Sequence, residues 1–135
     1  MAPPAPPTTV ASNSASFSAG AESDFVFQIN GLRASVGLNG LATNAVLNNY
    51  ARWCAKHMAD TGKVAHSDIG SLLHNPWSVV SENVAHGASA NSVFNALVAS
   101  PSHYPHMVDP QFTAVGVGAY LDSTGRLWTA HVFGG

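Results

Sequence analysis

The chain has 135 residues, of which 46% are hydrophobic and only 9% are charged, and its formal net charge is −2. This length is typical of a single domain and is sufficient for a hydrophobic core. The five basic residues are scattered, so the sequence lacks the basic patch of a nucleic-acid-binding protein. No apolar run reaches the roughly 18–20 residues of a membrane-spanning helix. The single cysteine, Cys54, excludes an intramolecular disulfide.

Residues 1–23 differ from the rest of the chain because they are rich in Pro, Ala, Ser and Thr. A segment with so few large apolar side chains cannot bury enough surface to fold, so we predict that it is disordered. It also lacks the basic and hydrophobic regions of a signal peptide. We interpret it as the flexible N-terminus that remains after a signal peptide is removed. One folded domain is expected to follow, over residues 24–135.

Apolar residues at helical spacing predict three helices in the first three quarters of the chain. The first starts at Ser23, which can cap it, and is stopped by Gly37. The second follows residues 43–44 and ends near Gly62. A shorter helix is predicted from about residue 91 to residue 99, since Pro101 ends it.

The C-terminal third has the alternating pattern of β-strands. Strands are predicted over residues 112–121 and 126–133, joined by a turn at residues 122–125. Residues 77–84 are a candidate for a further strand. Because the helices come first and the strands later, we predict an α+β fold in which helices cover an antiparallel sheet.

Seven histidines against five lysines and arginines are the most unusual feature of the composition. Histidine is the commonest metal ligand and titrates near neutral pH. Glu82 stands in a stretch without other charges, so we expect it either to be paired, with a histidine as the obvious partner, or to serve a chemical task. Several of the histidines lie among turn-forming residues, namely His66, His74, His86, His103 and His106.

A zinc site needs three or four nitrogen, oxygen or sulfur ligands. His66, Glu82 and His103 could supply three of them only if the fold brings them together, because their spacing matches no local metal motif. The alternative is that these histidines lie in loops and bond to backbone groups.

Other catalytic chemistry has less support in the sequence. There is no GxSxG motif, and Ser100 and Ser102 lie in a turn sequence beside Pro101. Cys54 lies on an apolar helix face, where a thiol is usually an unreactive small hydrophobic group.

Taken in chain order, several segments resemble the CAP superfamily, also called SCP-like, which includes the cysteine-rich secretory, antigen-five and pathogenesis-related proteins. The segment WSVVSENVAHG (77–87) is similar to the family's GEN(I/V) signature, and SPSHYPHMVDPQFTAVGVG (100–118) to its SPGHR…F..VGVG block. Residues 29–41, 47–68 and 127–135 resemble its first helix and turn, its second helix with a following histidine, and its closing strand.

This resemblance implies an α-β-α sandwich with a central antiparallel sheet of three or four strands and a central cleft. It places His66, Glu82 and His103 at three of the four cleft positions, where the two histidines can hold a divalent metal and the acid orients them. The sequence departs from the family pattern, since no second acid precedes SPSH, Ser81 replaces a glycine and Tyr104 replaces an arginine. These changes imply a weaker or altered metal site.

The resemblance also implies a secreted, extracellular protein, for which a binding or antioxidant module is favoured over a hydrolase and the question of an enzyme stays open. Its expected ligand is a divalent metal such as zinc, a haem or porphyrin, or a small apolar molecule. The expected metal ligands are His66, His103 and Glu82, and the same residues with His106 would contact a cofactor. We expect a monomer.

The short form with a single cysteine also resembles secreted bacterial antioxidants of this family. Radical scavenging would then use a bound haem or metal, or the sacrificial oxidation of Cys54, Met58, Met107, Tyr104 or the tryptophans. Two alternatives remain. One is a metal-dependent hydrolase with Glu82 as the catalytic base, and the other is a module that binds sterols or lipids.

Overall fold

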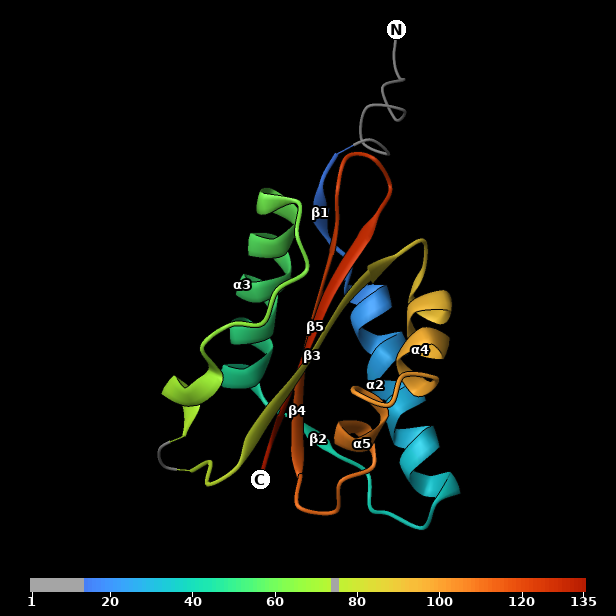
Figure 1. Ribbon diagram of the computed structural model, residues 1–135, viewed down its shortest axis with the longest axis vertical. Helices are drawn as coiled ribbons and strands as arrows, with labels where there is room; N and C mark the ends of the chain where they lie inside the picture. The colour runs from blue at the N-terminus through green and yellow to red at the C-terminus, as the bar shows by residue number, and fades with distance from the viewer. Residues whose placement is uncertain (1–13, 74–75) are drawn as a thin grey trace, which may run out of the picture.

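The protein, described by a computed structural model over residues 14–73 and 76–135, has a single sheet covered by helices on both faces (Figure 1). Helix α3 covers one face, while α2, α4 and α5 cover the other. The predicted α+β sandwich is therefore confirmed. Its elements are β1 (Ser16–Phe17), α2 (Ala19–Ser35), β2 (Ala42–Thr43), α3 (Ala45–Thr61), η1 (Ile69–Leu72), β3 (Val80–Gly87), α4 (Ala90–Val98), α5 (Tyr104–Met107), β4 (Ala114–Leu121) and β5 (Leu127–Gly134).

The sheet has the strand order β1-β4-β5-β3, with β2 also paired to β4. The three eight-residue strands β3, β4 and β5 are antiparallel and correspond to the strands predicted from the sequence. The two-residue strands β1 and β2 raise the total over residues 14–73 and 76–135 to five, where three or four were expected. They were missed because two residues are too short to produce an alternating pattern. Strand β2 is parallel to β4, so the sheet is not wholly antiparallel.

The first helix begins earlier than predicted. Its N-cap is Ser18, whose side-chain oxygen accepts a hydrogen bond from the backbone N–H of Ala21 at 3.1 Å, and Ser23 lies inside the helix. Residues 16–23 therefore form a short strand and the first helical turn, and the prediction that they are disordered is wrong. Alanine and glycine before Glu22 are too small to give a clear helical pattern of large apolar side chains, although they are compatible with a helix. Residues 1–13 of the predicted disordered segment lie outside the described residues.

Helix α3 lies unusually close to the sheet. Asn44 caps its N-terminus, and Gly62 ends it with a positive φ of 72°. Gly116 and Gly118 on β4 face this helix, and a Cβ on either would overlap the helix backbone at Leu47 or Ala51. The absence of these side chains lets the helix backbone rest on the strand, which fixes where α3 and the loop after it can lie.

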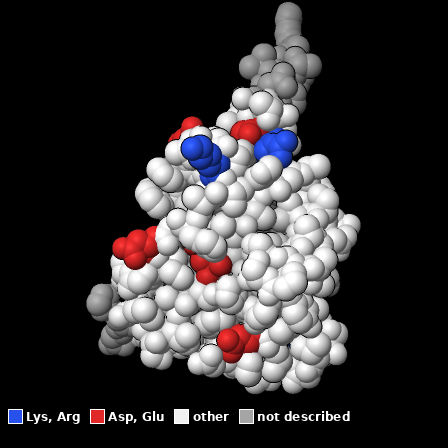
Figure 2. Space-filling model, viewed as in Figure 1, with Lys and Arg blue, Asp and Glu red and all other residues white. Residues whose placement is uncertain are grey.

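Each face of the sheet has its own hydrophobic core. The core under α2 and α4 includes Phe25, Ile29 and Phe133, while the core under α3 includes Leu47, Met58 and Trp128. Much of the molecular face shown in Figure 2 carries no charged side chain. Among the described residues, no helix is long and apolar enough to cross a membrane.

Buried Arg33 joins the C-terminal end of α2 to two loops. Its guanidinium donates hydrogen bonds to four backbone carbonyls, those of Asn39 (2.8 Å), Met107 (3.2 Å), Asp109 (2.9 Å) and Phe112 (3.3 Å). Burial lowers the pKa of Arg33, and the charge of Asp109 opposes this shift. The planar fork of an arginine can reach several acceptors at once, which a single ammonium group cannot do.

We predict that Arg33→Lys lowers the free energy of unfolding by about 2–3 kcal/mol, because several buried carbonyls lose their donor. Urea denaturation followed by circular dichroism measures the change. The same substitution at exposed Arg126 is the control and should change stability by less than about 0.5 kcal/mol. Equal effects at the two positions would contradict the role of Arg33.

Candidate functional site

The predicted pairing of Glu82 with a histidine is present at the outer strand of the sheet. Glu82 lies on β3 and His66 in the loop after α3, and His66 Nδ1 is 3.0 Å from Glu82 Oε1. The side chain of Glu82 is 1% exposed, while that of His66 is 66% exposed. A buried carboxylate thus orients an imidazole whose other ring nitrogen, Nε2, has no hydrogen bond within the described part of the chain.

The carboxylate of Glu82 is held in place by the loop that carries His66. Ser67 donates both its backbone N–H to Glu82 Oε1 at 2.9 Å and its hydroxyl to Oε2 at 2.7 Å. Tyr50 on α3 donates in turn to the Ser67 hydroxyl at 2.8 Å. With three donors on two oxygens, Glu82 is suited to positioning His66 rather than to activating a water molecule.

A pocket of about 470 Å³ opens beside this pair, between α3 and the loop of residues 65–71. On its α3 side the rings of Trp53 and His57 are stacked, with centroids 5.1 Å apart and planes 7° apart. Trp53 is 58% exposed, although it is a large apolar side chain. The pocket is lined by Tyr50, Trp53, Cys54, His57, Met58, Ala65, His66, Ser67, Asp68 and Ser71. It combines an aromatic wall with one oriented imidazole.

The thiol of Cys54 faces the same cluster and is not reactive there. Burial, with a smaller contribution from the charge of Glu82, raises the pKa of Cys54 to about 11, although a hydrogen bond with Ser67 opposes the shift. A thiol with this pKa is protonated at neutral pH and is a poor nucleophile. The interpretation of Cys54 as a small apolar group agrees with this environment.

His103 and His106 lie on the loop and short helix that follow α4, and each has a different partner. His103 Nδ1 is 2.7 Å from the Ser100 hydroxyl, and His106 Nδ1 is 2.8 Å from Asn83 Oδ1. Asn83 also donates to the backbone carbonyl of His103 at 3.0 Å. The pKa of His106 is lowered by burial, then by the charges of His103 and His66. His103 and His106 are therefore linked through Asn83.

The structure brings His66 and Glu82 into contact, but His103 is hydrogen-bonded to Ser100 and not to either of them. Within residues 14–73 and 76–135, no group of three His, Cys, Asp or Glu side chains is arranged to hold a metal ion. Of the other histidines considered, His86 contacts Trp128 and Arg126 near the far end of β3, outside the pocket. His74 lies outside the described residues.

One unusual histidine was not predicted from the sequence as a site residue. His131 on β5 is fully buried, its ring lies 4.5 Å from that of Phe25, and neither ring nitrogen has a partner among the described residues. Burial, with a smaller contribution from His103, lowers its pKa to about 3. The sequence signal was its position on the inward-facing side of the strand, alternating with Thr129 and Phe133.

Comparison with known proteins agrees with the fold. The sequence profile of the cysteine-rich secretory protein (CAP) family matches residues 26–132. A comparison with curated protein sequences gives no match. An outer surface protein from Borrelia burgdorferi superposes with a TM-score of 0.77 at 20% identity, covering 86% of this chain and 92% of its own.

Two further solved structures have the same fold. An extracellular SCP-domain protein from Bacillus anthracis has a TM-score of 0.76 at 21% identity, covering 85% of this chain and 40% of its own, so the present chain spans less than half of that protein. Venom allergen-like protein 4 from Schistosoma mansoni has a TM-score of 0.66 at 14% identity, with 87% and 90% covered. Since the family profile matches most of the sequence, the chain belongs to the CAP family of cysteine-rich secretory proteins.

Proposed function

We propose that this CAP domain is a secreted ligand-binding module that holds a haem or related porphyrin in the pocket beside His66, and that it acts as an extracellular antioxidant. The observation that carries the proposal is the contact between buried Glu82 and exposed His66. Secretion is supported by the extracellular and outer-surface proteins among its structural neighbours.

The residues of the pocket fit a haem-type ligand. Haem iron is commonly bound by one axial histidine, and a carboxylate on the other ring nitrogen fixes the imidazole and raises its basicity. His66 and Glu82 provide this pair, and Trp53 and His57 provide a flat wall for a planar ring system. When bound, such a group supplies the redox chemistry needed to quench radicals. The protein residues bind it, orient it and shield one face from water.

A zinc ion is a weaker match to the same residues. Zinc needs three or four ligands, whereas in the described part of the chain only His66 and Glu82 are in contact, and Glu82 already accepts three hydrogen bonds. The same occupancy of Glu82 speaks against a hydrolase that uses it as a base. A sterol or lipid remains the second candidate ligand, because Trp53 and Met58 give the pocket apolar surface.

The test is an absorbance titration of the protein with hemin, run beside a calorimetric titration with zinc. We expect a saturable shift of the Soret band in the wild type. His66→Ala should weaken hemin binding by about tenfold or more, since it removes the imidazole that would hold the iron, and Glu82→Gln should weaken it by roughly tenfold because the imidazole loses its charged partner.

His86→Ala is the matched control, because His86 is also an exposed histidine but lies outside the pocket. It should bind hemin like the wild type. Zinc binding without a Soret shift would contradict the proposed haem ligand and favour a metal ion instead. A lack of response to both, with lipid in an organic extract of the purified protein, would favour the lipid carrier.

A further inference from the structure

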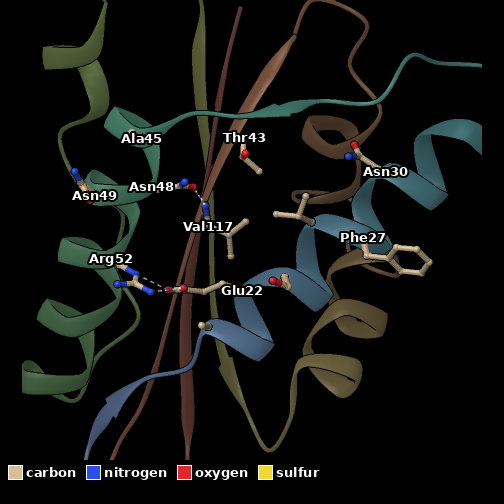
Figure 3. A pocket seen from close by; sticks show the side chains of 12 residues that line it. Glu22, Phe27, Asn30, Thr43, Ala45, Asn48, Asn49, Arg52 and Val117 are labelled. Carbon is tan, nitrogen blue, oxygen red and sulfur yellow. Dashed lines mark hydrogen bonds and ion pairs between the residues drawn. The ribbon is translucent and has the colours of Figure 1, made fainter.

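A second groove, of about 650 Å³, lies between α2 and α3 over the outer edge of β4 (Figure 3). None of the histidines that the structure describes lines it, so it is separate from the candidate site at His66. We propose that this groove binds a neutral saccharide chain. The proposal goes beyond the haem-binding function and does not depend on it.

The lining of the groove has the chemistry of a sugar site. Seven of its twelve residues are polar, and most of these carry neutral amides or hydroxyls. An amide side chain can donate and accept at the same time, so it can bind the neighbouring hydroxyl groups of a sugar ring. The polar residues are Glu22, Ser23, Asn30, Thr43, Asn48, Asn49 and Arg52.

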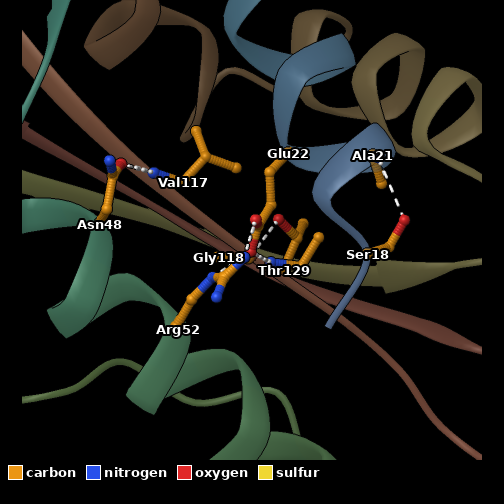
Figure 4. Close-up of polar contacts among 9 residues, drawn as sticks. Ser18, Ala21, Glu22, Asn48, Arg52, Val117, Gly118 and Thr129 are labelled. Atoms are coloured by element: carbon orange, nitrogen blue, oxygen red, sulfur yellow. Dashed lines mark hydrogen bonds and ion pairs between the residues drawn. The ribbon is translucent and has the colours of Figure 1, made fainter. Parts of the chain in front are cut away.

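The two charged residues of the groove neutralise each other. Arg52 Nη2 is 2.6 Å from Glu22 Oε1, and Arg52 Nε is 2.9 Å from Oε2 (Figure 4). The guanidinium also lies 4.8 Å from the ring centroid of Phe17. Since the pair leaves no net charge in the groove, an uncharged ligand is favoured over an anion or a cation.

Two side chains of the groove are fixed by hydrogen bonds, and each keeps a further N–H donor that makes no hydrogen bond among the described residues. Asn48 Oδ1 accepts the backbone N–H of Val117 at 3.2 Å, and this contact fixes the amide group. In the described part of the chain, no hydrogen bond uses Nδ2 of Asn48 or Nη1 of Arg52. Both donors belong to α3, on one side of the groove (Figure 3). Groups that are already fixed lose little conformational entropy when a ligand binds.

Part of the polar lining has a structural role at the edge of the sheet. Glu22 and Asn48 accept hydrogen bonds from backbone N–H groups of β4 at positions where no strand pairs with it. This role does not explain Phe27, which is 80% exposed on α2. Figure 3 shows its ring turned outward from the rim of the groove. An aromatic ring can stack on the apolar face of a sugar, so Phe27 would contact a chain that continues beyond the groove.

The test is a titration of the full chain with triacetylchitotriose, and separately with maltotriose, followed by amide NMR. At least one sugar should cause saturable shifts of the side-chain amides of Asn48 and Asn49. Ala45→Glu should weaken binding by about tenfold or more, because the new side chain fills the groove and introduces a charge. The fold should be kept, since Ala45 is the first residue of α3 and an acidic group is favourable at a helix N-terminus.

Val46→Glu is the control, since Val46 is the next residue, is exposed and does not line the groove. It should bind the sugar like the wild type, and so should His66→Ala. The proposal is overturned if neither sugar shifts the groove residues, or if Ala45→Glu binds as tightly as Val46→Glu. Retained sugar binding in His66→Ala separates this result from any failure of the haem proposal.

Discussion

Gly118→Ala should destabilise the protein by about 3 kcal/mol or more. The added Cβ would overlap the backbone of Ala51 in the middle of α3. A flexible side chain could move aside, but a helix backbone can yield only if the whole helix shifts from the sheet. Chemical denaturation with urea, or loss of soluble folded protein, measures the effect.

Gly31→Ala is the matched control, because Gly31 lies inside α2 and a Cβ there meets nothing within 4 Å. Alanine is a better helix former than glycine, so this variant should be more stable by about 1 kcal/mol. The two substitutions add the same methyl group, and opposite signs are expected. If Gly118→Ala were as stable as the wild type, this result would contradict the close approach of the α3 backbone to β4.

The sequence predicted the long elements well, because each combines a clear period with a clear stop signal. Helix α3 has an apolar face from Leu47 to Met58 and ends at Gly62, and it was predicted nearly to the residue. The start of α2 was misplaced, because residues 19–22 contain no large apolar side chain that would extend the helical period. Strand β3 also begins three residues later than predicted, since Ser78 and Val79 bond to the terminal residue Gly135 before the regular strand starts.

Prediction of the site was limited by a different factor. Nothing in the spacing of His66 and Glu82 requires them to meet, and only the family resemblance brought them together. The resemblance also grouped His103 with them. In the structure a turn brings the hydroxyl of Ser100, three residues earlier in the chain, next to the imidazole of His103 and gives it a local partner. The groove of Asn48 and Arg52 had no sequence signal, because its walls come from two helices on opposite faces of the sheet.

The buried imidazole of His131 should make the protein sensitive to acid. Its pKa is about 3 in the folded state against an ordinary value of 6.5, so between these pH values the unfolded chain binds a proton that the folded chain does not. Stability is therefore lost as the pH falls below 6.5, and this residue alone contributes a slope of about 1.4 kcal/mol per pH unit. Half-buried His106, whose pKa is also lowered, adds to the slope in the same direction.

His131→Leu should remove most of this acid sensitivity, because leucine fills a similar space and takes up no proton. It should also be at least as stable as the wild type at pH 7, since neither ring nitrogen has a partner to lose among the described residues. Urea denaturation in steps of roughly one pH unit between pH 4 and pH 7 measures both effects. His57→Gln is the control, because His57 is exposed on α3. If the free energy of unfolding of His131→Leu fell with pH as steeply as that of the wild type, other groups would control acid unfolding. The imidazole of His131 would then have to gain a hydrogen-bond partner or a water molecule when it is protonated.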